Sequence, residues 1–160
     1  MDQSAQVQTH ILVATDLSEE ANCALETAAT LAQAMGACLS AVVCVIPIAP
    51  VPSFGVVSAA ETRATVTAAL RESAEARLKV LVAKYWPGLA VKAAEVLTGV
   101  NEAETICEYA REQHADWVVV GTHGRTGLRH MLIGSVAERV VRHAPCHVVV
   151  ARSAHEPPAA

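Results

Sequence analysis

The sequence predicts a three-layer α/β fold, in which one open sheet of five parallel strands carries helices on both faces. Five short apolar runs alternate with stretches of helical periodicity, which is typical of a repeated strand–helix unit. Most of these runs are too continuously apolar for a sheet with one face in water, so we expect parallel strands that are covered on both sides. The expected strand order is 3-2-1-4-5, which places the first and fourth strands side by side.

The five strands are assigned to the apolar runs. They are expected at residues 10–15, 38–46, 91–97, 116–121 and 146–151.

The first two helices are indicated by apolar residues three and four positions apart. The first is expected from about Ser18 to Met35 and ends at Gly36, a residue that suits a helix end. The second is longer, from about residue 59 to 85, and stops at Pro87-Gly88. Their expected inner faces comprise Ala21, Leu25, Ala28, Ala29, Ala32 and Met35 in the first helix, and Val66, Leu70, Ala74, Leu78, Leu81 and Tyr85 in the second.

The last two helices carry capping signals. Asn101 and Glu104 form an Asn version of the capping box at the start of the third helix, which directs Ile106 inward. The fourth is expected at 135–143, where Ser135 and Glu138 form a second capping box.

Length and composition indicate one domain over residues 1–160, with an ordered core at about 9–152. A chain with 52% hydrophobic residues can build a continuous core. A net charge of −4 and only 3% aromatic residues argue against nucleic-acid binding, and the charge also argues against anionic membranes. No apolar run is long enough to span a membrane and no signal peptide is indicated, so we expect a soluble, cytoplasmic protein.

The cysteines and histidines do not suggest a metal site. Five cysteines without CxxC spacing fit reduced thiols rather than a disulfide framework or a zinc site. His143, Cys146 and His147 are close in sequence, but Pro145 breaks the helix among them and adjacent strand residues point to opposite faces. We therefore expect no metal ligands in the protein itself.

The most informative segment is GTHGRTGLRHMLIGS, from Gly121 to Ser135, between the fourth strand and the fourth helix. It is about twice the usual length of such a connection, which is about 2–6 residues. Its glycines allow close approach of backbone amides, Arg125 and Arg129 add positive charge, and the following helix offers unpaired amides. The segment predicts an anion site, most simply for a nucleotide phosphate.

Two segments should form this site together. Ligands of open parallel sheets bind beyond the carboxyl ends of the strands, where the strand order reverses. The first strand ends at 14–16 and the fourth at Gly121, so their loops would share one crevice. The proline-containing segment 47–57 lies beside it and is either a lid or an ordinary long connection.

The chain resembles the universal stress protein family in its ATP-binding branch. The resemblance covers nearly the whole chain and rests on ILVATDLSEEA at 11–21, Cys44-Val45-Ile46, VLTG at 96–99, and GxxG, nine residues, Gly-Ser from 121 to 135. It implies a Rossmann-like fold of the adenine nucleotide alpha hydrolase type. Two positions depart from the family pattern: Ala14 stands where a proline is frequent, and Cys44 where a histidine is frequent.

The resemblance also implies binding roles. Gly124, Gly134, Ser135 and Val136 would meet the phosphates, and Val120 and Gly121 would border the ribose. Ala14, Thr15 and Asp16 would line the nucleoside side, and the main chain of Val45 would bind the adenine edge. From the residues alone, Asp16 is either a turn residue or a ligand of a ribose hydroxyl or Mg²⁺, of which we favour the ribose. Ser135 is either a helix cap or a phosphate ligand, and Arg125 either a solvated charge or a phosphate ligand.

We therefore expect an ATP-binding stress-response regulator that takes ATP with Mg²⁺ and hydrolyses it slowly or not at all. No GxxxxGK[ST] loop and no GxSxG motif is present, and no catalytic residue is predicted. An enzyme that cleaves ATP between the α and β phosphates would need an SGGxDS-type loop where this chain has TDLSEE. The alternative is a non-catalytic interaction module of the same fold. The downstream protein partner is not identified by the sequence.

The last strand predicts assembly. Residues 146–151 would lie at a sheet edge and contain no Lys or Pro to protect it. Pairing of this strand with its copy across a two-fold axis would satisfy its free amides. The family resemblance implies the same homodimer.

Overall fold

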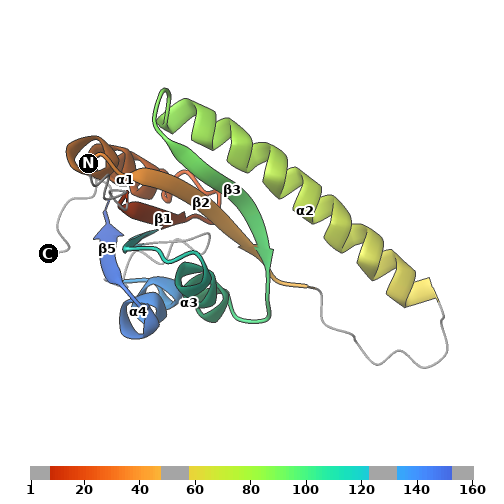
Figure 1. Cartoon of the computed structure of the whole chain (residues 1–160). Coiled ribbons are helices and arrows are strands. Elements are labelled where there is room, and N and C mark those ends of the chain that lie inside the picture. Colours follow the sequence, from red (N-terminus) through yellow and green to blue (C-terminus); the bar gives the residue numbers. More distant parts are fainter. Residues whose placement is uncertain (1–7, 48–57, 123–132, 153–160) are drawn as a thin grey trace, which may run out of the picture.

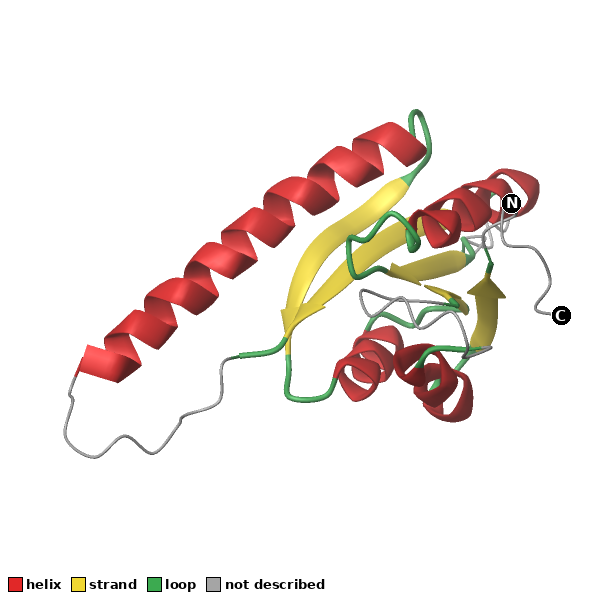
Figure 2. Ribbon diagram, turned by 180° about the vertical axis from the view of Figure 1, so that it is seen from behind, coloured by secondary structure: helices red, strands yellow, loops and turns green. Residues whose placement is uncertain are grey.

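A computed structural model describes residues 8–47, 58–122 and 133–152 of the chain (Figures 1 and 2). Its sheet has five parallel strands in the order β3-β2-β1-β4-β5. The strands are β1 (His10–Ala14), β2 (Cys38–Val45), β3 (Val91–Thr98), β4 (Trp117–Gly121) and β5 (His147–Ala151). The predicted fold class and strand order are confirmed, and every strand boundary lies within one residue of its expected position.

Four helices cover the sheet in the described part of the chain. They are α1 (Asn22–Met35), α2 (Ser58–Tyr85), α3 (Glu102–Glu112) and α4 (Ser135–His143). One core cluster joins α1 and α2 to the first face of the sheet, and a second joins α3 and α4 to the opposite face (Figure 2). All five residues of β1 are buried because the strand lies between both layers. Burial on both faces of the sheet therefore explains the continuous apolar runs of the sequence, as predicted.

The first helix begins later than predicted. It starts at Asn22 rather than Ser18, because Asp16 and Ser18 bond to each other and hold a separate turn before it. Met35, expected on the inner face, is 41% exposed, whereas the end at Gly36 is confirmed by its left-handed conformation.

The long helix α2 has the predicted extent but packs only through its second half. Ala74 and Leu78 are buried, whereas Val66 and Leu70, which the sequence placed on the inner stripe, are 40% and 48% exposed. Figure 1 shows the cause: the N-terminal half of α2 runs past the carboxyl end of β3, where the sheet offers no surface to cover it.

The two capping predictions have different outcomes. Asn101 is the N-cap of α3, and its side chain accepts a hydrogen bond from the backbone N–H of Glu104. The capping box expected at Ser135 is wrong, since the N-cap of α4 is Gly134 and Ser135 is the first residue of the helix. Gly124 and Arg125, and residues 48–57 of the connection after β2, lie outside the described residues. No helix in the described ranges is long and apolar enough to cross a membrane.

Candidate functional site

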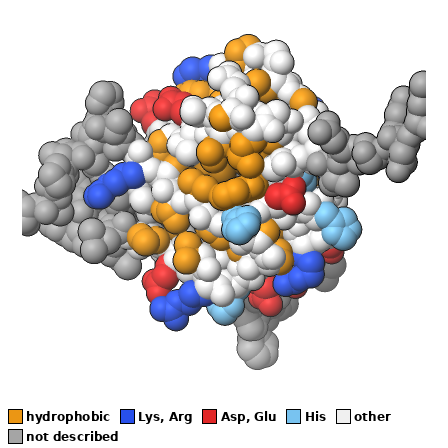
Figure 3. All heavy atoms as spheres, turned by 60° about the vertical axis from the view of Figure 1, so that its left-hand side comes forward, with side chains coloured by type: hydrophobic (Ala, Val, Ile, Leu, Met, Phe, Trp, Pro, Cys, Tyr) orange, Lys and Arg blue, Asp and Glu red, His pale blue; other side chains and the backbone are white. Residues whose placement is uncertain are grey.

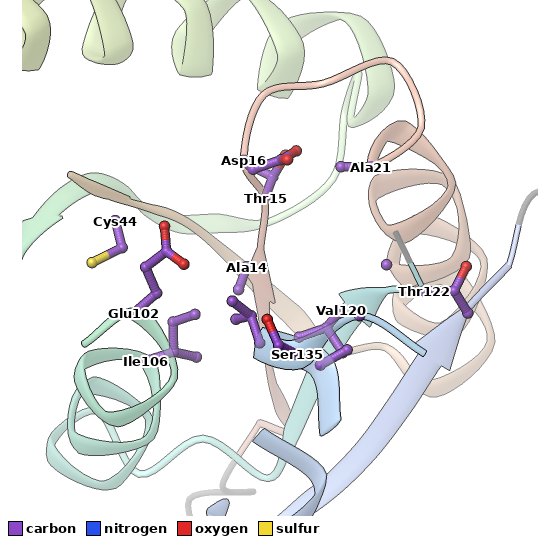
Figure 4. Close-up of a pocket in the computed structure, with 14 residues that line it drawn as sticks. Ala14, Thr15, Asp16, Ala21, Cys44, Glu102, Ile106, Val120, Thr122 and Ser135 are labelled. Carbon is purple, nitrogen blue, oxygen red and sulfur yellow. The ribbon is translucent and has the colours of Figure 1, made fainter. Parts of the chain in front are cut away.

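A pocket lies at the carboxyl ends of β1 and β4, where the strand order reverses (Figure 4). We call it the strand-end pocket. Its volume is about 290 Å³, and the starts of α3 and α4 close it on two sides. The residues that line it are Ala14, Thr15, Asp16, Ala21, Cys44, Glu102, Ile106, Val120, Gly121, Thr122, Gly134, Ser135, Val136 and Ala137.

The turn after β1 is held by its own side chains. Thr15 Oγ1 accepts a hydrogen bond from the N–H of Leu17 at 3.0 Å, and the N–H of Thr15 donates to the carbonyl of Val42 in β2. Asp16 Oδ1 accepts from both the N–H and the hydroxyl of Ser18, at 3.0 and 2.6 Å. The carboxylate of Asp16 is thus fixed at the rim of the pocket before any ligand binds.

Leu17 in this turn has φ of 65°, a left-handed conformation that is uncommon for a branched side chain. The side chain of Leu17 is buried, and its carbonyl accepts a hydrogen bond from Arg77 of α2 at 2.9 Å. These contacts hold the strained conformation and connect α2 to the rim of the pocket.

The start of α4 presents backbone amides to the pocket. The N–H of Gly134 donates to the carbonyl of Thr122 at 2.7 Å, which holds the helix start against the end of β4. A Cβ atom at Gly134 would lie 3.2 Å from that carbonyl oxygen, so a glycine allows this close approach. No side chain of the described residues caps α4, and the amides of its first turn, from Ser135 to Ala137, have no acceptor within the helix. Such amides, together with the helix dipole, are suited to an anion.

The wall opposite α4 carries Glu102 and Cys44. Glu102 is the first residue of α3, and its carboxylate points into the pocket near Cys44 and Ala14 (Figure 4). Burial, more than the nearby Glu102 carboxylate, raises the pKa of the Cys44 thiol, while hydrogen bonds with Thr105 and Gly99 oppose the rise. Cys44 is therefore a neutral thiol at physiological pH, and Glu102 supplies the charge of this wall.

A second cavity, the α2 pocket, adjoins the first. It has a volume of about 400 Å³ and lies between the end of β2 and α2. Its lining includes Val45, Leu70 and Arg77, and it shares Asp16, Cys44 and Glu102 with the strand-end pocket. The two cavities thus join at these three shared residues.

The structure brings most of the predicted site residues together. Those that line the strand-end pocket are Ala14, Thr15, Asp16, Val120, Gly121, Gly134, Ser135 and Val136. Val45 lines the α2 pocket instead, and Gly124 and Arg125 fall in a segment that is not described. The roles assigned to these residues remain predictions.

Sequence reasoning missed several lining residues, namely Ala21, Cys44, Glu102, Ile106, Thr122 and Ala137. For Glu102 a signal was present, because it stands in the first turn of a helix that follows a parallel strand. Such helix starts lie at the same edge of the sheet as the other strand ends.

The arrangement suits a ligand with an anionic end and an uncharged end. The amides of α4 attract an anion, and Val120, Ile106 and Ala14 supply an apolar wall. Between these features lie the carboxylates of Asp16 and Glu102, which are able to accept hydrogen bonds from a ligand. No group of three or more His, Cys, Asp or Glu side chains in the described part of the chain is placed to hold a metal ion.

A family model, described as the universal stress protein family, matches residues 9–152. Among curated proteins, the chain is similar to a universal stress protein of Methanocaldococcus jannaschii, with 42% identity over 85 residues. That alignment covers 52% of this chain and 48% of the relative, so the chain spans about half the length of the curated relatives it matches.

Solved structures are similar over most of their length. The universal stress protein UspA of Lactobacillus plantarum has 26% identity and a TM-score of 0.68, and the comparison covers 90% of this chain and 97% of that one. A universal stress protein of Archaeoglobus fulgidus in complex with dAMP has 22% identity and a TM-score of 0.59, with 91% and 99% covered. Other neighbours of the same fold were solved with cAMP and with AMP.

Proposed function

Because the chain belongs to the universal stress protein family, we propose that it binds adenine nucleotides, ATP in particular, and acts as a nucleotide-dependent regulator of the stress response. The observation that carries this proposal is the start of α4, whose uncapped amides face the strand-end pocket beside Gly121 and Gly134. Neighbours with bound cAMP, dAMP and AMP make an adenine nucleotide the natural ligand to test.

The proposed placement follows the two joined cavities. The phosphates lie at Gly134, Ser135 and Val136, where the helix dipole and the amides favour negative charge. The adenine lies in the α2 pocket beside the main chain of Val45. Gly124 and Arg125 are proposed to add to the phosphate contacts, as the sequence motif implies. Mg²⁺ would arrive with the polyphosphate, since the described residues gather no metal cluster of their own.

We further propose that hydrolysis is slow or negligible. The chain has no GxxxxGK[ST] loop to hold the β and γ phosphates, and burial raises the pKa of the Cys44 thiol, which keeps that thiol neutral. An ATPase kcat near the enzyme median of about 10 s⁻¹ would contradict this part of the proposal.

A direct test is titration calorimetry of the purified protein with ATP and AMP in the presence of Mg²⁺. ATP should bind more tightly than AMP, because the added phosphates reach more of the α4 amides. Ser135→Ala should weaken ATP binding by about tenfold or more if the hydroxyl bonds a phosphate. The same variant should keep its thermal stability, because Gly134 and not Ser135 caps the helix. Absence of binding by the unmodified protein would favour the interaction module instead.

Dimerisation through β5 is a further part of the proposal. Among the described residues, β5 pairs only with β4, and its central valines 148–150 are partly buried, whereas the valines beside them in β4 are buried. Figure 3 shows apolar side chains gathered on this side of the molecule. A copy of the same strand would cover them.

The five free cysteines and the nucleotide ligand together suggest a reducing compartment, the cytoplasm.

A further inference from the structure

We propose that Glu102 determines the sugar specificity of the site by accepting a hydrogen bond from a ribose hydroxyl. The site then prefers ribonucleotides to the analogue that lacks this hydroxyl. The inference rests on the nucleotide-binding function proposed above and gives a role to a residue that the sequence analysis did not select.

The position of Glu102 is fixed by the first turn of α3. The side chain of Asn101 accepts from the N–H of Glu104, and the hydroxyl of Thr105 donates to the carbonyl of Asn101 at 2.8 Å. The next turn is anchored in the core, because Ile106 and Ala110 are buried against the sheet. The backbone of this turn therefore places Glu102 at the pocket wall without a ligand.

Glu102 stands where the two cavities join. It lines the strand-end pocket, which holds the anion site, and also the α2 pocket, which holds Val45. A nucleotide has its base, ribose and phosphates in that covalent order. If the phosphates lie at α4 and the base beside Val45, the ribose occupies the junction. Asp16 is the other carboxylate at this junction, and a ribose offers two vicinal hydroxyl donors.

The carboxylate of Glu102 calls for a hydrogen-bond donor. Among the described residues of the strand-end pocket there is no Lys or Arg to pair with it. The nearby Arg77 donates to the carbonyl of Leu17. A phosphate between two carboxylates would be repelled, whereas a hydroxyl group donates a charge-assisted hydrogen bond to either one. The described residues give Glu102 no ion-pair partner that would neutralise it.

Two other ligands for Glu102 are less well placed. The exocyclic amino group of adenine would lie deeper in the α2 pocket, whereas Glu102 lines both cavities. Mg²⁺ bound to a nucleotide is held largely by phosphate oxygens and water, and the phosphates are proposed to lie at α4 rather than at the junction. Binding of a cation by Glu102 would appear in the experiment as an effect that depends on Mg²⁺.

The experiment measures Kd by calorimetry for ATP, 2′-deoxy-ATP and 3′-deoxy-ATP, each with and without Mg²⁺. In the unmodified protein, at least one deoxy analogue should bind about tenfold or more weakly than ATP, because it leaves a carboxylate without its donor. In Glu102→Ala, the Kd of that analogue divided by the Kd of ATP should fall to about one. Glu102→Gln should keep part of the preference, because its amide oxygen still accepts a hydrogen bond.

Glu104→Ala is the matched control. It removes the same charge from the same helical turn, but Glu104 is exposed and lines neither cavity, so its ribose preference should equal that of the unmodified protein. The inference is overturned if Glu102→Ala weakens all three nucleotides equally or not at all, or if its effect appears only with Mg²⁺. If the unmodified protein binds ATP but shows no preference for ribose, only this inference fails. If it binds no nucleotide, the proposed function fails as well.

Discussion

His10, at the start of β1, is the one buried histidine in the described part of the chain. Its Nδ1 lies 3.3 Å from the carbonyl of Gln113, and its Nε2 lies 2.8 Å from the hydroxyl of Ser40. A carbonyl only accepts, so Nδ1 carries a proton. Burial is the main cause that lowers the pKa of the His10 imidazole, with Lys92 adding to the effect, and this favours the neutral ring, in which Nε2 accepts from the Ser40 hydroxyl.

This lowered pKa predicts acid sensitivity. The unfolded chain binds a proton at the ordinary histidine pKa of about 6.5, whereas the folded chain resists protonation. The free energy of unfolding should therefore fall as the pH drops below about 6.5, by at most about 1.4 kcal/mol per pH unit from this group. Urea denaturation between pH 5 and 8 measures the slope.

Replacement His10→Gln should flatten that slope while it retains a hydrogen-bonding side chain. His143→Gln, at an exposed position on α4, should leave the slope unchanged. An identical slope in His10→Gln and the unmodified protein would show that other groups cause the acid sensitivity.

At the scale of elements, α2 divides into a packed and an unpacked half. Leu78 is fully buried in the core cluster shared with α1, whereas Leu70 is 48% exposed. Leu78→Ala should lower the free energy of unfolding by about 2–5 kcal/mol, because it leaves a cavity. Leu70→Ala, the same chemical change two turns away, should alter it by about 0.5 kcal/mol or less. Equal losses in urea denaturation would mean that the first half of α2 is packed in solution.

The same helix shows what the sequence could and could not predict. The 3.6-residue repeat predicted the extent of α2, but its inner stripe is wrong at Val66 and Leu70, because periodicity cannot tell where the sheet beneath a helix ends. Before α1, the hydroxyl of Ser18 accepts from the N–H of Ala21, as a cap would, and donates to Asp16, yet the helix begins only at Asn22. Local side-chain bonds of this kind compete with helix formation and are decided by the neighbouring turn.

The parts of the candidate site that local sequence motifs encode were predictable, whereas the parts that depend on the packing of distant elements were not. Segments 14–16 and 134–136 were identified because strand ends and glycine-bounded helix starts have distinct sequences. Glu102 was missed, since its carboxylate meets the other segments only after α3 docks against the sheet. Gly134 has a second role that its sequence did not reveal, because a side chain there would press on the carbonyl of Thr122. Gly134→Val should then disturb the start of α4 as well as ligand binding.

For the whole molecule, the edge of β5 that no described strand pairs with predicts a homodimer. Val149 stands at the centre of the strand, in register with Val119 of β4. The N–H of Val149 points to β4, as that of His147 does, so the outward-facing donors of the edge belong to Val148 and Val150. Val148→Pro removes one of these donors and should shift the protein toward monomer. Sedimentation equilibrium at micromolar concentration measures the change. A monomeric unmodified protein, or a proline variant that stays dimeric while folded, would place the interface elsewhere or remove it.

The unpacked half of α2 also has a hydrodynamic consequence. A helix of 28 residues is about 42 Å long at 1.5 Å per residue, whereas a compact domain of this size has a radius of gyration of about 15 Å. A rod that projects from a globule raises the frictional coefficient without adding mass. A monomer would thus elute from a sizing column ahead of spherical standards of equal mass, and its elution volume alone would mimic partial dimerisation. Rotational diffusion should be anisotropic, so amide ¹⁵N relaxation rates will depend on the orientation of each helix.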